Sequence, residues 1–236
     1  MRPDRNDSTV SQLALPLRLA DHAVFSTFLG AGNETLVATM AGLADRIDGR
    51  GCWIWGPVAT GKTHLLQAAC DRAGDRSVYV PLADMFSAGP RILEGLASRE
   101  LVCLDDIDTV VKVADWEAAL FGLYNQLFDA GHNLIVSASM APRECATTLA
   151  DLQSRFASLP AFQLRPLQER QRVAALQLRA RHRGLELPDD TARFLLSRSR
   201  RDMASLYSLL DKLDREALRA KRRLTIPFVK DVLPNF

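Results

Sequence analysis

The residues with the clearest chemical role form a glycine loop. They read Gly56-Pro57-Val58-Ala59-Thr60-Gly61-Lys62-Thr63, which fits the phosphate-binding pattern G-x-x-x-x-G-K-T. The apolar run Cys52–Trp55 precedes this loop, and the residues that follow, 64–70, suit a helix. Between a strand and a helix, such a loop turns its backbone N–H groups, and those of the first helical turn, toward phosphate oxygens. The sequence therefore predicts a nucleotide site that uses Mg²⁺.

The expected nucleotide contacts come mostly from the main chain of this loop. Lys62 is expected to reach the terminal phosphates, and the Thr63 hydroxyl to ligate Mg²⁺. We assign the nucleotide-binding role to Gly56, Val58, Thr60, Gly61, Lys62, Thr63 and His64. A glycine-rich turn without function is the alternative, and the correct flanks on both sides disfavour it.

Two carboxylates follow a second apolar run. The stretch Leu101–Leu104 is followed directly by Asp105 and Asp106. A P-loop ATPase needs an acid at such a strand end, where it holds Mg²⁺ partly through water, opposite the threonine ligand. Asp105 fits this role, and Asp106 could orient the attacking water, although many ATPases place a longer Glu there. A strand followed by an Asp-rich turn is the alternative.

Two arginines are candidates for contact with phosphates. Arg155 lies in Leu152–Phe156, and an arginine there could stabilise charge on a transferring γ-phosphate, in its own site or in that of a neighbouring protein. A solvated helix residue is the alternative. Arg201 precedes a predicted helix that begins near Met203. It could fold back onto the phosphates or be an ordinary surface charge.

A short apolar peptide lies near the N-terminus, next to a polar stretch of residues 1–11. It reads Gln12-Leu13-Ala14-Leu15-Pro16-Leu17, and Pro16 prevents a helix through it. An exposed extended peptide with apolar anchors suits docking into a hydrophobic groove. Packing back on its own domain as an N-terminal strand is an equal alternative on these residues alone.

The remaining pattern predicts an α/β fold, an alternation typical of a parallel sheet. A helix is expected over about residues 36–48, strands over Val78–Pro81, Leu101–Leu104 and Asn133–Ser137, and a helix over Trp116–Ala130. After Pro166 the pattern becomes helical: over about 168–183, from Pro188, along Met203–Ala217, and in a short last helix capped by Thr225. We expect a tail with the apolar peptide (1–20), a nucleotide-binding α/β domain (21–165) and a small helical lid (166–236).

Composition adds limits. The chain has 236 residues and a net charge of +2. Residues 165–230 hold 17 Lys and Arg against 8 Asp and Glu, which suggests an anionic partner. The four cysteines are scattered, which favours reduced thiols in the cytoplasm. No apolar run approaches the roughly 20 residues that cross a bilayer, so we expect no membrane partner.

Together these motifs resemble the AAA+ ATPases, and within them the DnaA clade of replication initiators. Ser154-Arg155-Phe156 is similar to the clade's arginine-finger segment, and Arg201 falls at its sensor 2 position. Phe25–Phe28 and Gly30–Asn33 resemble the stretch that leads into adenine recognition. The sequence ends just after the expected lid, and the segment between Val80 and Leu101 is short. We therefore expect neither DnaA's helix-turn-helix domain nor its extra initiator helix.

The apolar peptide, Gln12–Leu17, is similar to a sliding-clamp-binding motif, which points to regulatory DnaA homologues of the Hda type. This resemblance implies a protein that holds ADP, or ATP, with Mg²⁺ and sits on the clamp, the DNA polymerase III beta subunit. DNA would be contacted indirectly through the clamp, and homo-oligomers are possible. Arg155 would then promote ATP hydrolysis by DnaA in trans, preventing re-initiation of replication.

The resemblance also bears on turnover by this chain. Where the clade often has an acidic sensor 1 residue, this chain has Ser137-Ala138-Ser139-Met140, so intrinsic hydrolysis is expected to be slow. A DNA-acting ATPase, either a helicase loader or a single-strand binder, is the alternative.

Overall fold

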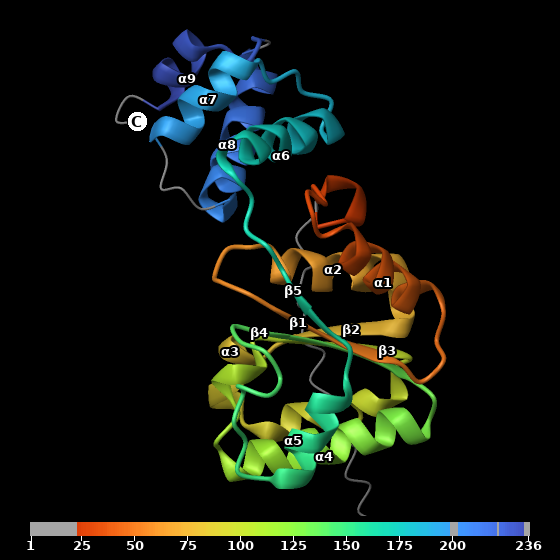
Figure 1. The fold of residues 1–236 in the computed structure, drawn as a ribbon. Helices are drawn as coiled ribbons and strands as arrows, with labels where there is room; N and C mark the ends of the chain where they lie inside the picture. The colour runs from red at the N-terminus through yellow and green to blue at the C-terminus, as the bar shows by residue number, and fades with distance from the viewer. Residues whose placement is uncertain (1–22, 199–202, 221, 234–236) are drawn as a thin grey trace, which may run out of the picture.

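A computed structural model describes residues 23–198, 203–220 and 222–233. Within these residues five parallel strands form one sheet in the order β2-β3-β4-β1-β5. Their bounds are β1 Gly51–Trp55, β2 Ser77–Pro81, β3 Leu101–Asp105, β4 Asn133–Ala138 and β5 Ala161–Gln163. Helices cover both faces of the sheet (Figure 1). This is the α/β architecture that the apolar runs predict.

The strand order sets the position of the functional loops. Strand β4 lies between β1 and β3, with Trp55 beside Ala138 and Leu104 beside Val136. Because all strands are parallel, the carboxyl ends of these three meet at one edge of the sheet. The glycine loop after β1 and the acids at the end of β3 therefore converge there.

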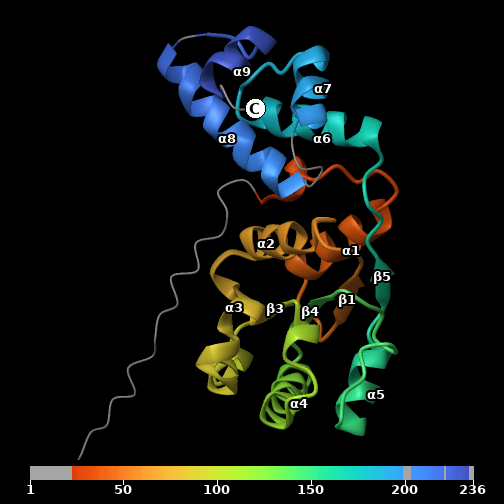
Figure 2. The same ribbon diagram turned by 90° about the vertical axis from the view of Figure 1, so that its left-hand side faces the viewer.

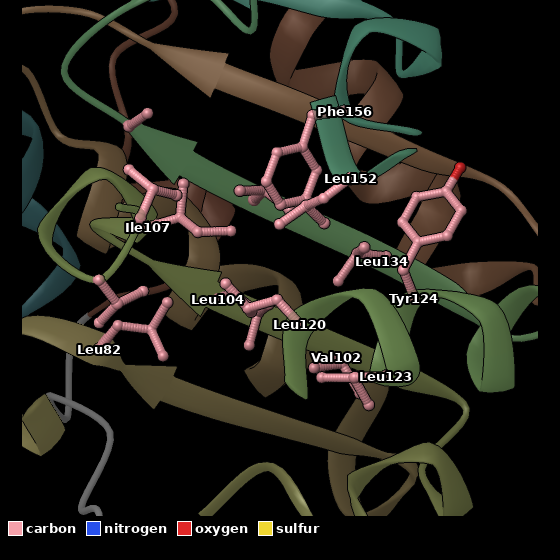
Figure 3. Packing of buried hydrophobic residues seen from close by; sticks show 14 of the residues in the cluster. Leu82, Val102, Leu104, Ile107, Leu120, Leu123, Tyr124, Leu134, Leu152 and Phe156 are labelled. Atoms are coloured by element: carbon pink, nitrogen blue, oxygen red, sulfur yellow. The ribbon is translucent and has the colours of Figure 1, made fainter. Parts of the chain in front are cut away.

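The two faces of the sheet carry separate helices and separate hydrophobic cores. Helices α1 (Glu34–Asp45) and α2 (Lys62–Ala73) pack on one face, where Leu65 and Leu66 are fully buried against the strands. Helices α3 (Leu82–Met85), α4 (Ala114–Asp129) and α5 (Ala150–Ser158) cover the other face. There Leu152 and Phe156 of α5 pack with α4 and the strands (Figure 3).

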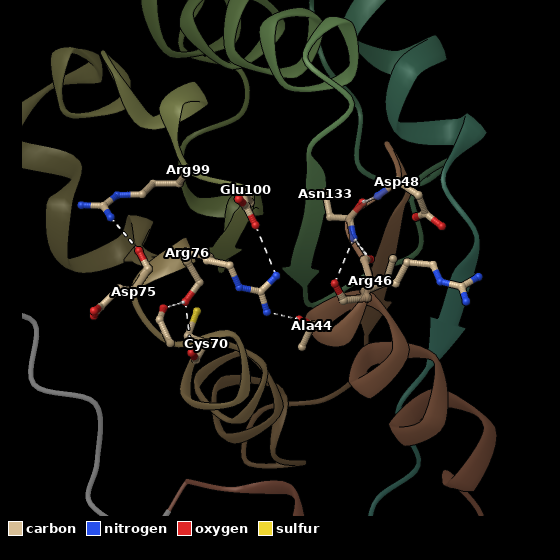
Figure 4. A network of polar contacts seen from close by, with 12 residues as sticks. Ala44, Arg46, Asp48, Cys70, Asp75, Arg76, Arg99, Glu100 and Asn133 are labelled. Carbon is tan, nitrogen blue, oxygen red and sulfur yellow. Dashed lines mark hydrogen bonds and ion pairs between the residues drawn. The ribbon is translucent and has the colours of Figure 1, made fainter.

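Helix α1 ends three residues earlier than the sequence pattern predicts. The cause is Asn133, a fully buried side chain at the start of β4. Its Nδ2 donates to the carbonyl oxygens of Leu43, at 2.9 Å, and Arg46, at 2.7 Å, and its Oδ1 accepts from the Arg50 N–H at 2.9 Å (Figure 4). The amide thus satisfies the helix terminus and turns the chain toward β1.

Two parts of the core fold were not predicted as elements. The segment after β2 forms α3 and three single 3₁₀ turns, Phe86–Ala88, Pro90–Leu93 and Leu96–Ser98, so it is irregular and short. Strand β5 is an edge strand of three residues, paired only with β1 and partly exposed. Neither segment has the long apolar period that marks a buried element.

The C-terminal helices form a separate bundle with its own core, as predicted. They are α6 Glu169–His182, α7 Asp189–Arg198, α8 Met203–Ala220 and α9 Ile226–Val232. The Thr225 hydroxyl accepts from the Phe228 N–H at 3.4 Å, so the expected cap of the last helix is present. The bundle lies over the sheet face that carries α1 and α2 (Figure 2).

Candidate nucleotide-binding site

The glycine loop has the backbone that its sequence requires. Gly61 has φ +103°, a backbone angle that residues other than glycine rarely adopt, and a Cβ there would lie 2.8 Å from the Phe28 ring. The loop is closed by the Thr60 hydroxyl, which donates to the Pro57 carbonyl at 2.9 Å. Val58 is 86% exposed at the loop tip. The loop is thus a tight turn whose outer side is open.

Helix α2 begins at Lys62, directly after the loop, and its first turn holds no acidic residue. Lys62 is only 7% exposed, and its Nζ donates to the carbonyls of Gly56, at 3.0 Å, and Pro57, at 3.3 Å. Among the described residues no carboxylate forms an ion pair with this ammonium. Thr63 is exposed in the same turn. A buried lysine and a helix N-terminus, neither neutralised, fit a phosphate group.

Asp105 is held by hydroxyl groups from the strands on either side of β3. Its carboxylate accepts from the Ser137 hydroxyl of β4 and, at 2.8 Å, from the Tyr79 hydroxyl of β2. The carboxylate is 2% exposed, so both oxygens are oriented by protein donors. Burial, the Asp105 charge and this hydrogen bond raise the pKa of Tyr79, which keeps the phenol a donor. This arrangement suits a metal ligand that needs a fixed direction.

Asp106 occupies the next position, in a left-handed conformation with φ +54°. Its N–H donates to the Ser137 hydroxyl at 2.9 Å, so one serine orients both acids. Burial and the neighbouring Asp105 charge raise the pKa of Asp106, while the positive charge of Lys62 lowers it. Lys62 is therefore close enough to act on this carboxyl, and the structure brings the two motifs together at one edge of the sheet.

The His64 side chain contacts the segment before α1. Its Nε2 lies 3.0 Å from the Val24 carbonyl, and its ring centroid lies 5.5 Å from that of Phe28. Burial lowers the pKa of His64, which favours the neutral ring. The residue therefore anchors the 3₁₀ turn Phe25–Thr27 to helix α2.

The same segment also holds the start of the lid. Asn33 is 4% exposed, and its amide bonds both ways with the backbone of Arg165. It accepts from the Arg165 N–H at 2.9 Å and donates to the Arg165 carbonyl at 3.3 Å. Asn33, the last residue of the predicted adenine-recognition stretch, thus ties this segment to the chain that leads into the lid.

Arg155 is placed far from this arrangement in the fold. It is exposed in the last turn of α5, and its guanidinium carbon lies 5.7 Å from the centre of the Tyr124 ring. Helix α5 packs on the sheet face opposite α2, so Arg155 and the glycine loop belong to different layers (Figure 1). Within the described part of the chain no carboxylate pairs with Arg155.

Other predicted site residues lie outside the described residues. These are Arg201 and the apolar peptide with Gln12, Leu13, Leu15, Pro16 and Leu17. Two residues of the site were not predicted from the sequence. The sequence predicts Tyr79 only as part of a strand, and Ser137 only as the end of a strand and as a replacement for an acid. Their contacts with Asp105 depend on the strand order, and a hydroxyl within a buried apolar strand is the one signal that could have indicated them.

The fold is similar to that of solved DnaA and RuvB structures. The structure is similar to domain III of DnaA from Thermotoga maritima, with a TM-score of 0.73 and 21% identity over 93% of this chain and 98% of that one. It is also similar to AMPPCP-bound DnaA from Aquifex aeolicus (TM-score 0.67, 21% identity, 86% of this chain and 70% of that one). A third similar structure is the RuvB branch migration motor of Thermotoga maritima (TM-score 0.59, 19% identity, 88% and 70%).

The lid gives the more specific relationship. Residues 169–233 match the family model of the Hda lid domain. This region spans α6 to α9. The rest of the chain shares its fold with the DnaA structure. Among the described helices, none is both long and apolar enough to span a bilayer.

Proposed function

We propose that this chain is a regulator that holds a nucleotide in its own site and supplies Arg155 to the site of DnaA. The observation that carries this proposal is the position of Arg155. Its side chain is exposed on α5, in the layer opposite the glycine loop. An arginine finger can act on a neighbouring protein's γ-phosphate, and a finger facing away from its own P-loop suits that use.

The chain's own site would hold ADP, or ATP, with Mg²⁺. The loop N–H groups and the start of α2 would bind the phosphates, and Lys62 would exchange its carbonyl partners for phosphate oxygens. Thr63 and Asp105 would hold the metal, which neutralises phosphate charge when bound. Arg201 would contact the nucleotide from the lid. A related DnaA binds AMPPCP, which supports the proposal.

Slow turnover in this site is part of the proposal. Ser137 stands where the clade often carries an acid, and it donates its hydroxyl to Asp105 instead of polarising water. Asp106 is a short side chain in a left-handed turn, and burial and the Asp105 charge raise its pKa. Bound nucleotide would therefore act mainly as a conformational lock.

The peptide Gln12–Leu17 would bring this chain to the replication fork by binding the sliding clamp. Its sequence, with apolar anchors at Leu13, Leu15 and Leu17, suits the groove of the sliding clamp. DnaA would then be met on DNA that carries the clamp. The expected result is an initiator left with ADP after replication has begun, which prevents re-initiation.

The test is a reconstitution with DnaA carrying labelled ATP. Addition of this chain and DNA-loaded clamp should accelerate hydrolysis, and the clamp or the chain alone should not. The variant Gln12→Ala with Leu15→Ala should lose clamp pull-down and most of the stimulation while keeping ADP binding. Hydrolysis at the DnaA basal rate in the complete mixture would contradict the proposal.

A DNA-acting ATPase remains the second candidate, because the lid carries exposed basic residues. That function requires turnover in the chain's own site, stimulated by DNA. Own-site hydrolysis that rises with single-stranded DNA and is lost in Lys62→Ala, without any effect on DnaA, would favour it.

A further inference from the structure

The outer face of helix α8 carries an unusual separation of charge. Its exposed charged side chains are all basic: Lys212, Arg215 and Arg219. Spacings of three and four residues place them on one stripe of the helix. The buried residues Leu206, Leu210, Leu213 and Ala217 occupy the opposite stripe, against the lid core. The basic stripe therefore faces directly away from the protein.

Two of the three acids of α8, Asp211 and Asp214, pair with arginines in and just after helix α6. Arg183 bonds to Asp214 at 2.9 Å and to Asp211 at 3.0 Å, and Arg179 lies 3.5 Å from Asp211. The two arginine side chains are only 9% and 12% exposed. Because these pairs are internal, they leave the outward charge of α8 positive.

The stripe is only partly paired along its own helix. Glu216 lies 3.0 Å from Arg219. Lys212 and Arg215 have no ion pair among the described residues. Past the end of α8, Arg222 and Arg223 are exposed as well, and Arg222 pairs with Asp231 at 3.0 Å. Two more exposed arginines thus follow the end of α8.

We propose that this stripe binds the phosphate backbone of duplex DNA without reading its sequence. A rise of 1.5 Å per residue puts Lys212 and Arg219 roughly 10 Å apart along the helix. Duplex DNA carries about one charge per 1.7 Å of axis, so that span faces about six phosphate charges. This contact is separate from the clamp peptide and from Arg155, and it does not rest on the proposed function.

A duplex fits this surface better than a single strand. Binding of single strands uses aromatic side chains on which bases stack. The aromatic residue of α8, Tyr207, is instead packed under the Arg179 guanidinium, 4.3 Å from its ring centre. The exposed side chains of the stripe offer charges for phosphates and no stacking surface.

Salt dependence of binding tests the proposal. The full-length protein is titrated into a labelled 20-base-pair duplex of arbitrary sequence, without clamp, and fluorescence anisotropy is followed at several salt concentrations. Non-specific binding with a Kd of about 10⁻⁴ to 10⁻⁶ M at physiological salt is expected. The triple variant Lys212→Gln, Arg215→Gln and Arg219→Gln removes three phosphate contacts. The plot of log K against log salt has a negative slope, and its magnitude should fall by roughly 2 to 3 in this variant.

The matched control removes the same net charge elsewhere on the lid. Arg170→Gln, Arg181→Gln and Arg193→Gln replace three exposed basic residues on α6 and α7. This control should change the slope by less than about 1. If the triple variant of the stripe melts early, Lys212→Gln alone, at a position without an ion pair, should still lower the slope by about 1.

Several results would overturn the proposal. Equal losses in both triple variants would mean that charge acts diffusely. Unchanged duplex binding in the stripe variant would show that the stripe does not contact DNA. If that variant also lost the stimulation of DnaA, the stripe would be a protein-binding surface instead. Tighter binding to a 20-nucleotide thymidine strand than to the duplex would show a single-strand site.

Discussion

At the scale of single residues, the main result is that hydroxyl groups of the protein orient the carboxylate of Asp105, the proposed Mg²⁺ ligand. Asp105 accepts hydrogen bonds from Tyr79 and Ser137, which come from strands on opposite sides of β3. Ser137 also accepts from the Asp106 N–H at 2.9 Å. Outer-shell partners of this kind hold a ligand in its metal-binding direction. Ser137 is therefore a positioning residue for both acids.

Replacement of this hydroxyl should weaken Mg²⁺-nucleotide binding. We expect Ser137→Ala to lower the affinity for Mg²⁺-ADP roughly 10- to 100-fold, the usual effect of losing an outer-shell partner. Isothermal titration calorimetry measures this directly. Ser139→Ala is the matched control, because that exposed serine bonds to Asp108 instead. Equal affinities of the two variants for Mg²⁺-ADP would show that Ser137 does not position the Mg²⁺ ligand.

At the scale of elements, a buried carboxylate connects α4 to the start of α5. Glu117 is 1% exposed and accepts from the N–H groups of Lys112, Thr148 and Leu149, at 2.8 to 3.0 Å. Burial opposes its ionisation, yet these donors outweigh burial and hold the pKa of Glu117 below its usual value. Leu149 is the residue that caps α5, so Glu117 sets the position of the helix that carries Arg155.

Loss of this charge should destabilise the fold. In Glu117→Gln an NH₂ group replaces one carboxylate oxygen and faces backbone N–H groups, which are also donors. We expect the free energy of unfolding to fall by about 2 to 3 kcal/mol. Because the folded pKa is depressed, the contribution is present above pH 4.5 and lost as pH falls through the folded pKa. Denaturant unfolding at pH 7 measures it. Glu144→Gln, at an exposed position, should cost little, and equal costs would contradict the account.

The elements also show how far sequence reasoning extends. Strands β1, β3 and β4 are apolar runs that are almost entirely buried, so their pattern alone predicted them. Strand β5 was not predicted, because three half-exposed residues on an edge have no such pattern. The end of α1 was placed too late, since it is set by Asn133, which lies about 85 residues away in the chain.

Some parts of the candidate site could likewise be predicted from the sequence, and others could not. The glycine loop and Asp105 are short local motifs, and the sequence predicted both. The hydrogen bonds from Tyr79 and Ser137 were not predicted, because they follow from β2, β3 and β4 being neighbours. Contacts between strands depend on the strand order, which spacing along the chain does not encode.

At the scale of the whole molecule, the nucleotide loop and the lid lie together on one side of the sheet, and Arg155 lies on the other (Figures 1 and 2). Asn33 ties the segment before α1 to Arg165, at the start of the lid. His64 ties the same segment to α2, and the charge of Arg179 in the lid contributes to lowering its pKa. The lid and the nucleotide loop are thus joined through one segment.

This junction should make stability depend on pH. The folded state favours neutral His64, so its contribution is complete above pH 6.5 and is lost as pH falls toward the lowered folded pKa. Between pH 7 and pH 5 the wild type should lose stability faster than His64→Gln, by at most about 1.4 kcal/mol per pH unit. Urea unfolding across this range measures the difference. His182→Gln, at an exposed position, is the control, and parallel curves for all three proteins would refute the assignment.

The central claim is that Arg155 acts in the site of another protein. Its most direct test compares wild type, Arg155→Ala and Arg155→Lys for hydrolysis of labelled ATP on DnaA, in the presence of DNA-loaded clamp. Both variants should keep ADP binding and clamp binding, because Arg155 is exposed and outside the nucleotide site. Arg155→Ala should reduce hydrolysis to the DnaA basal rate, and Arg155→Lys should restore little, since an ammonium lacks the forked donor geometry. Full stimulation by Arg155→Ala would contradict the account.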